Sequence, residues 1–122
     1  MELPKSEEQL MKFLWKLKRA FMKDLINQYP EPKPASTTIA TLIKRMRDKK
    51  VVDYKLYGNS REYFPLISKQ AYFEDHLQGL IKNHFDDSAA QFASFFANSS
   101  KLTPEQLKEL RKLIDDQIDE AI

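Results

Sequence analysis

The sequence predicts a mainly α-helical chain in which a winged helix-turn-helix domain, residues 1–68, precedes a helical dimerisation domain, residues 69–122. Three observations predict this fold. Residues 36–50 have the pattern of an amphipathic helix with one apolar side and one polar, basic side. Two segments rich in β-branched and aromatic residues follow it and flank a Gly-Asn-Ser turn. From residue 69 onwards the pattern is helical, without the signal of a strand.

Composition excludes several kinds of chemistry. The chain has 122 residues, no cysteine and two glycines. Disulfides, zinc–thiolate sites and thiol catalysis are therefore excluded. Two glycines are too few for the glycine-rich loops that bind phosphate, so such loops are almost ruled out. The N-terminus lacks a basic region followed by an apolar run, and no apolar stretch is long enough to span a bilayer. We expect a soluble cytoplasmic protein with no membrane insertion and no cofactor.

The net charge of +2 hides an uneven distribution. Residues 1–68 hold 14 Lys and Arg against 8 Asp and Glu, whereas residues 69–122 hold 6 against 10. Residues 33–61, the basic stretch, hold 8 against 2. Such a patch attracts nucleic acid by neutralising phosphates, although an acidic protein surface or anionic lipid would attract it as well.

The first two helices precede the basic stretch. Ser6-Glu7-Glu8-Gln9 has the form of a capping box, which predicts a helix with Ser6 as N-cap, ending near Lys18. A second helix is expected over residues 21–29, because three prolines follow it. The apolar stripe of the first helix consists of Leu10, Phe13, Leu14 and Leu17, and the prolines are Pro30, Pro32 and Pro34.

Residues 36–50 are predicted to form the recognition helix of a helix-turn-helix, with Ser36 as N-cap. Its apolar stripe is Ile39, Leu42, Ile43 and Met46. Its other side carries hydroxyls near the start and cations towards the end, which suits base edges and phosphates in a DNA groove. The candidate DNA-binding residues are Ser36, Thr37, Thr38, Ala40, Thr41, Lys44, Arg45 and Arg47. The alternative is an ordinary surface helix with a solvated charged face.

Residues 51–57 and 61–64 predict a β-hairpin, which would be the wing. The candidate DNA contacts near its tip are Lys55, Asn59 and Arg61. In the alternative reading the hairpin only closes the core. In either case Tyr54, Leu56, Tyr63 and Phe64 are expected inside.

Three short helices are expected in the second half: residues 70–84, residues 88–97, and one that starts at the capping box Thr103-Pro104-Glu105-Gln106. About fifty residues of amphipathic helix cannot easily cover their own apolar faces, so we predict a homodimer. The alternative is that these helices fold back onto the winged helix. The candidate dimerisation residues are Phe73, Leu77, Leu80, Phe92, Phe95, Phe96, Leu107, Leu110, Ile114 and Ile118.

No catalytic or metal site is expected. His76 and His84 are eight residues apart on one predicted helix, too far for a pair that grips a metal. The acidic run around Asp115 and Asp119 is the pattern of a solvated helix face. We therefore predict that the protein is not an enzyme.

The sequence resembles the penicillinase and methicillin-resistance repressor family, also called the BlaI/MecI/CopY family. Three segments carry the resemblance. Residues 8–15, EQLMKFLW, match the family's opening helix with its tryptophan, and residues 38–46, TIATLIKRM, match its recognition-helix pattern T-[VI]-x-T-L-[LI]-x-R-[LM]. Residues 63–66, YFPL, match the end of its wing.

The resemblance implies a dimeric transcriptional repressor whose two winged helices bind a palindromic double-stranded DNA operator. Family members of the β-lactamase branch are cut in the tail, commonly between asparagine and phenylalanine, through a membrane-sensor-linked protease. The corresponding candidate cleavage site here is Ser94-Phe95, where the asparagine is absent. The copper-responsive branch uses cysteine pairs, which this chain lacks. The alternative function is a winged-helix protein-interaction module that uses its basic face on an acidic protein partner.

Overall fold

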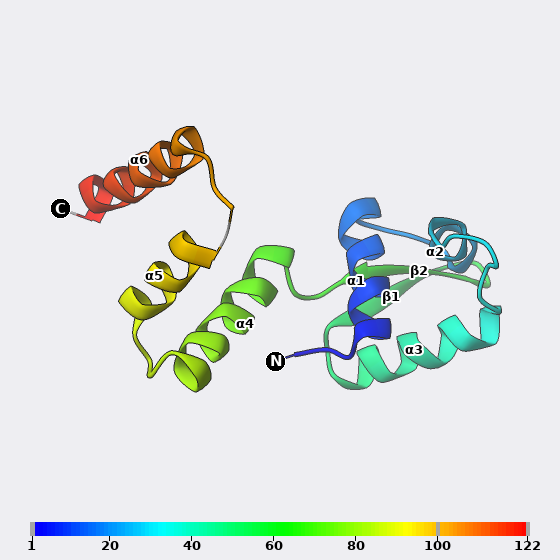
Figure 1. Ribbon diagram of the computed structural model, residues 1–122. Helices are drawn as coiled ribbons and strands as arrows, with labels where there is room; N and C mark the ends of the chain where they lie inside the picture. The colour runs from blue at the N-terminus through cyan, green and yellow to red at the C-terminus, as the bar shows by residue number, and fades with distance from the viewer. Residues whose placement is uncertain (1, 100, 122) are drawn as a thin grey trace. The chain divides into compact units, whose positions relative to one another are not determined.

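The computed structural model describes residues 2–99 and 101–121 and confirms the predicted fold class. The elements in chain order are α1 (Lys5–Leu17), α2 (Met22–Gln28), α3 (Ser36–Asp48), β1 (Val52–Tyr57), β2 (Ser60–Pro65), α4 (Lys69–His84), α5 (Ala89–Ser99) and α6 (Pro104–Ala121) (Figure 1). The chain divides into two compact units, Met1–Leu77 and Gln78–Ile122. This division falls inside α4, later than residue 68, where the sequence analysis placed its boundary.

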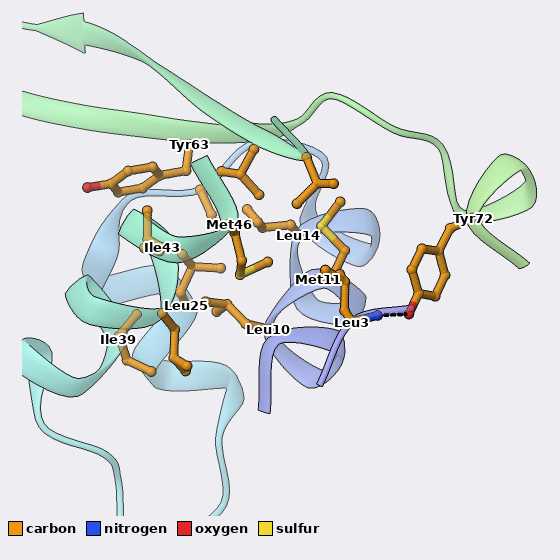
Figure 2. Packing of buried hydrophobic residues seen from close by; sticks show 14 residues of the cluster. Leu3, Leu10, Met11, Leu14, Leu25, Ile39, Ile43, Met46, Tyr63 and Tyr72 are labelled. Carbon is orange, nitrogen blue, oxygen red and sulfur yellow. Dashed lines mark hydrogen bonds between the residues drawn. The ribbon is translucent and has the colours of Figure 1, made fainter. Parts of the chain in front are cut away.

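The core of the first unit collects apolar side chains from its three helices. Figure 2 shows Leu10 and Leu14 of α1 and Leu25 of α2 pointing towards the apolar side of α3. The four predicted residues of that side are all buried: Ile39, Leu42, Ile43 and Met46. Each such side chain contributes about 1.5–3 kcal/mol when it is fully buried. Together they fix which side of α3 faces outwards.

The hairpin is antiparallel, with a ladder that runs from Val52 opposite Pro65 to Tyr57 opposite Ser60. Its turn residue Gly58 has φ = 61°, a left-handed conformation that glycine adopts without strain. Strand β2 also pairs with Ala20, a contact that the sequence pattern does not predict. The Tyr63 N–H donates to the Ala20 carbonyl at 2.7 Å, and the Ala20 N–H donates to the Tyr63 carbonyl at 3.0 Å. This exchange ties the hairpin to the connection between α1 and α2.

Two predicted helix caps are wrong. Helix α1 begins before Ser6, because the Pro4 carbonyl already accepts the Glu8 N–H at 2.8 Å, and Pro4 is the N-cap. Helix α3 likewise has Ala35 as its N-cap, and Ser36 is its first helical residue. The backbone of Ala35 is extended and its carbonyl accepts the first helical hydrogen bonds. The Ser36 hydroxyl therefore has no capping role and stays exposed.

Leu56 does not enter the core, contrary to the sequence-based expectation. It is 59% exposed, whereas Tyr63 is buried and Tyr54 and Phe64 are half-buried. Its partner across the ladder is Arg61, next to the pair that closes the turn. The hairpin joins the core through Val52 and Tyr63, and Leu56 lies outside that cluster.

The start of α4 belongs to the first unit because Tyr72 anchors it there. The Tyr72 hydroxyl accepts the Leu3 N–H at 2.9 Å (Figure 2). It also donates to a Glu8 carboxylate oxygen at 2.8 Å. Burial raises the pKa of Tyr72 above its ordinary value. The Trp15 indole N–H donates to the Ile67 carbonyl at 2.9 Å.

The second unit contains the rest of α4 with α5 and α6. The ring of Phe85 lies 5.5 Å from that of Phe92 and 5.3 Å from that of Phe95 between centroids. The predicted capping box at the start of α6 is confirmed. The Gln106 N–H donates to the Thr103 hydroxyl at 3.2 Å, and the Thr103 N–H donates to the Gln106 side-chain carbonyl at 2.9 Å.

Candidate nucleic-acid interface

The outward side of α3 carries the residues that the sequence analysis predicted to bind DNA. Since Ile39 and Met46 point into the core, the polar positions between them face solvent. The eight nominated residues of α3 are all exposed: Ser36, Thr37, Thr38, Ala40, Thr41, Lys44, Arg45 and Arg47. The wing residues Lys55, Asn59 and Arg61 are exposed too. The structure therefore places every nominated side chain where a macromolecule can reach it.

The Thr41 hydroxyl donates a hydrogen bond within α3. Its Oγ1 donates to the Thr37 carbonyl at 3.0 Å, one turn earlier. The oxygen keeps its capacity to accept a hydrogen bond, and the methyl group stays exposed.

The cations of the basic stretch fall into two groups. Lys44 and Arg45 form no ion pair with any residue in the described ranges, so their charges are available to a ligand. Lys33 serves the fold instead, because its ammonium donates to the Tyr29 carbonyl at 2.6 Å and to the Asn27 carbonyl at 3.2 Å. The surface that a ligand meets is therefore less positive than the count of residues suggests.

Lys49 is also used internally, by a partner that the sequence analysis missed. Its ammonium lies 2.7 Å from a carboxylate oxygen of Glu7, a side chain in the first turn of α1 that is 3% exposed. This ion pair holds the end of α3 against the start of α1. The two residues are 42 positions apart, so no local sequence pattern predicts their contact.

Arg47 and Arg61 both contact the ring of Tyr54. The Arg47 guanidinium lies 4.4 Å from the centroid of the Tyr54 ring, and that of Arg61 lies 4.5 Å from it. At the tip, Lys55 lies 5.7 Å from the ring centroid of Tyr57. An open cavity of about 570 Å³ between the hairpin and α2 is lined in part by Asn59 and Arg61, so α2 does not cover these two side chains.

The other candidate residues occupy the helices after the wing. Phe73 packs on Trp15, with 5.9 Å between centroids, so it contributes to the first unit as well as being a candidate for dimerisation. Ser94 and Phe95 lie inside α5 with both side chains exposed, and the Asn98 amide donates to the Ser94 carbonyl at 2.9 Å. The described residues contain no cluster of three or more His, Cys, Asp or Glu that would hold a metal.

Three helices, the third with an outward basic side, and a wing define a winged helix-turn-helix protein of the DNA-binding class. The chain belongs to the penicillinase repressor family, whose sequence profile matches residues 3–116. It is therefore a DNA-binding transcriptional repressor and not an enzyme. The family resemblance noted in the sequence is confirmed.

Solved structures include two similar proteins. A structure of the CopR repressor has 25% identity and a TM-score of 0.46, covering 56% of this chain and 100% of that chain. A structure of Bordetella bronchiseptica BpsR, a protein whose DNA binding is regulated by 6-hydroxynicotinic acid, has 13% identity and a TM-score of 0.52. It covers 97% of this chain and 76% of that chain, and the likeness shows a shared fold. No curated protein matches the sequence.

Across residues 2–99 and 101–121, none of the helices combines the length and the apolar character needed to cross a bilayer.

Proposed function

We propose that the protein acts as a homodimer that binds a palindromic operator, with the α3 helix of each copy in the major groove. Residues 69–122 form the dimerisation domain. The side chains directed towards base edges are Thr37, Ala40, Thr41 and Lys44. Those on the backbone are Arg45, Arg47, Lys55 and Arg61. Two symmetric copies read half-sites separated by about one helical turn, roughly 34–36 Å, or a multiple of it.

The observation that carries this proposal is the outward side of α3. Its 13 residues present exposed hydroxyls followed by the exposed cations Lys44, Arg45 and Arg47, and the buried stripe holds the helix with that side outwards. A major groove about 12 Å wide admits a helix of this kind. The wing adds Lys55 and Arg61 directly after the helix in the chain.

The dimer is supported by apolar surface that the chain leaves uncovered. On α6, Ile114 is 60% exposed, and Leu113 and Ile118 are exposed as well. With Leu110 they line an open, mostly apolar groove. Apolar patches of this kind mark interaction surfaces in soluble proteins. A second copy of the same helix is the partner that a palindromic operator requires.

Selection of bound duplexes from a random DNA pool tests the proposal. We expect an inverted repeat to be enriched, and to bind about a thousandfold or more tightly than scrambled DNA. Equal weak binding to all duplexes would contradict an operator-reading repressor. That result would favour the alternative in which the basic face binds an acidic protein.

Replacing Arg45 with alanine is expected to weaken binding about 10-fold to 100-fold, because a symmetric dimer loses two charged contacts. The slope of log Kd against log salt should fall by about two units. Fluorescence anisotropy over a salt series measures both quantities.

Lys112→Ala is the matched control. It removes the same charge from α6, outside the proposed DNA surface. An Arg45→Ala protein that binds as Lys112→Ala does would contradict the placement of Arg45 on the backbone.

A further inference from the structure

Tyr54 brings together two cations that the sequence assigned to separate elements. Arg47 comes from the last turn of α3, and Arg61 comes from β2 of the wing. Their guanidinium carbons lie 4.4 Å and 4.5 Å from the centroid of the same ring. Each position is within the range of an attractive cation–π contact. The recognition helix and the wing therefore meet at one aromatic side chain.

The position of the Tyr54 ring follows from the core. Tyr54 faces Tyr63 across the ladder, and their ring centroids are 5.9 Å apart in an edge-to-face arrangement. Tyr63 is buried. Arg61 precedes Tyr63 by two residues on the same strand, so both side chains leave the same face of the hairpin. Tyr54 and Arg61 are thus diagonal neighbours on that face.

Asp53 orients the first of the two cations. Its carboxylate oxygen lies 3.6 Å from the Arg47 Nε, so the ion pair uses the Nε edge of the guanidinium. Among the described residues, Arg47 has no ion-pair partner besides Asp53, and the Arg61 guanidinium has none. Both cations therefore keep hydrogen-bond donors for a ligand.

A backbone phosphate carries one negative charge and accepts hydrogen bonds from planar guanidinium forks. Its chemistry therefore matches the unused donors of both arginines.

We infer that Arg47, Tyr54 and Arg61 form one unit, here called the Tyr54 clamp, in which the Tyr54 ring holds both guanidiniums in place for DNA backbone phosphates. Tyr54 is a positioning residue in this clamp, because it acts through the two arginines. The inference rests on the proposed DNA-binding role of this surface. It implies that the recognition helix and the wing engage the backbone together.

A double-mutant cycle tests the clamp on a labelled duplex of arbitrary sequence, since phosphate contacts do not depend on sequence. Tyr54→Leu in the full chain should lower affinity about tenfold and reduce the salt slope, because two stacking contacts are lost. Tyr54→Phe keeps the aromatic face and should restore binding. In an Arg47→Ala/Arg61→Ala background, Tyr54→Leu should change affinity by no more than about twofold.

Two further variants separate positioning from folding. Tyr29→Leu removes a tyrosine elsewhere in the first unit, where its ring packs on Phe13, and should leave DNA binding unchanged. Arg61→Lys keeps the charge at an exposed position but loses the planar fork, and should weaken binding about threefold.

Equal losses from Tyr54→Leu in the two backgrounds would overturn the clamp while leaving the DNA-binding proposal standing. A wild-type chain without salt-dependent binding to the duplex would overturn both.

Discussion

Replacing Ile114 with aspartate is expected to separate the dimer and to lower affinity for the inverted repeat by about 10²–10⁴-fold, the gain that linking two binding modules provides. Ile114 is 60% exposed in the single chain, so the substitution leaves the core of that chain intact. In the dimer it would bury an unpaired carboxylate, which is costly in an apolar interface. Analytical ultracentrifugation measures the assembly, and titration with the full repeat measures the affinity.

Two comparisons make this result specific. Lys112→Ala lowers the net charge by one unit, as Ile114→Asp does. Lys112 is two residues before Ile114, so the two side chains lie about 200° apart around α6. That variant should remain dimeric. Affinity for an isolated half-site should be the same in the wild type and Ile114→Asp. A dimer that survives the Ile114→Asp substitution would contradict the role given to α6.

Removing Lys49 is expected to lower the free energy of unfolding by about 2 kcal/mol. The Glu7 carboxylate is buried and its cation lies 2.7 Å away, so Lys49→Ala leaves a buried charge without its partner. The cost is lower than for a fully buried pair, because the Lys49 side chain is 37% exposed. The helix dipole at the start of α1 also stabilises the remaining carboxylate. Urea denaturation measures the difference.

The double variant Glu7→Gln/Lys49→Ala identifies the cause. Replacing the carboxylate by a neutral amide removes the unpaired charge, so the double variant should regain part of the stability lost in Lys49→Ala. A Lys49→Ala chain as stable as the wild type, or a double variant less stable than Lys49→Ala, would show that the ion pair does not hold α3.

The helices and their buried sides could be predicted because helical periodicity is local. All four apolar residues assigned to the inner side of α3 are buried. The capping box at Thr103 was predictable for the same reason, since its reciprocal bonds join residues three apart. The caps at Ser6 and Ser36 were not, because a serine in the first turn of a helix looks the same in sequence as a capping serine. The choice depends on the backbone of Pro4 and Ala35.

The exposure of the candidate interface residues was predictable from the sequence, whereas the contacts that these residues make were not. Exposure of residues such as Thr37 and Lys44 follows from the helical pattern. The ion pair between Glu7 and Lys49 and the convergence of two arginines on Tyr54 depend on tertiary packing. The pairing of Ala20 with Tyr63 involves a single residue outside the strands. A single residue cannot show the alternation of apolar and polar side chains by which a strand is predicted.

The hydrogen bond inside α3 has a consequence for the operator sequence. Because the Thr41 hydroxyl proton is held by the Thr37 carbonyl, this side chain meets a base only as an acceptor and a methyl group. The guanine edge in the major groove offers two acceptors, which Thr41 cannot satisfy in that state. Adenine and cytosine offer amino donors, and thymine offers a methyl group for apolar contact. In the proposed complex, the half-site position opposite Thr41 therefore disfavours guanine.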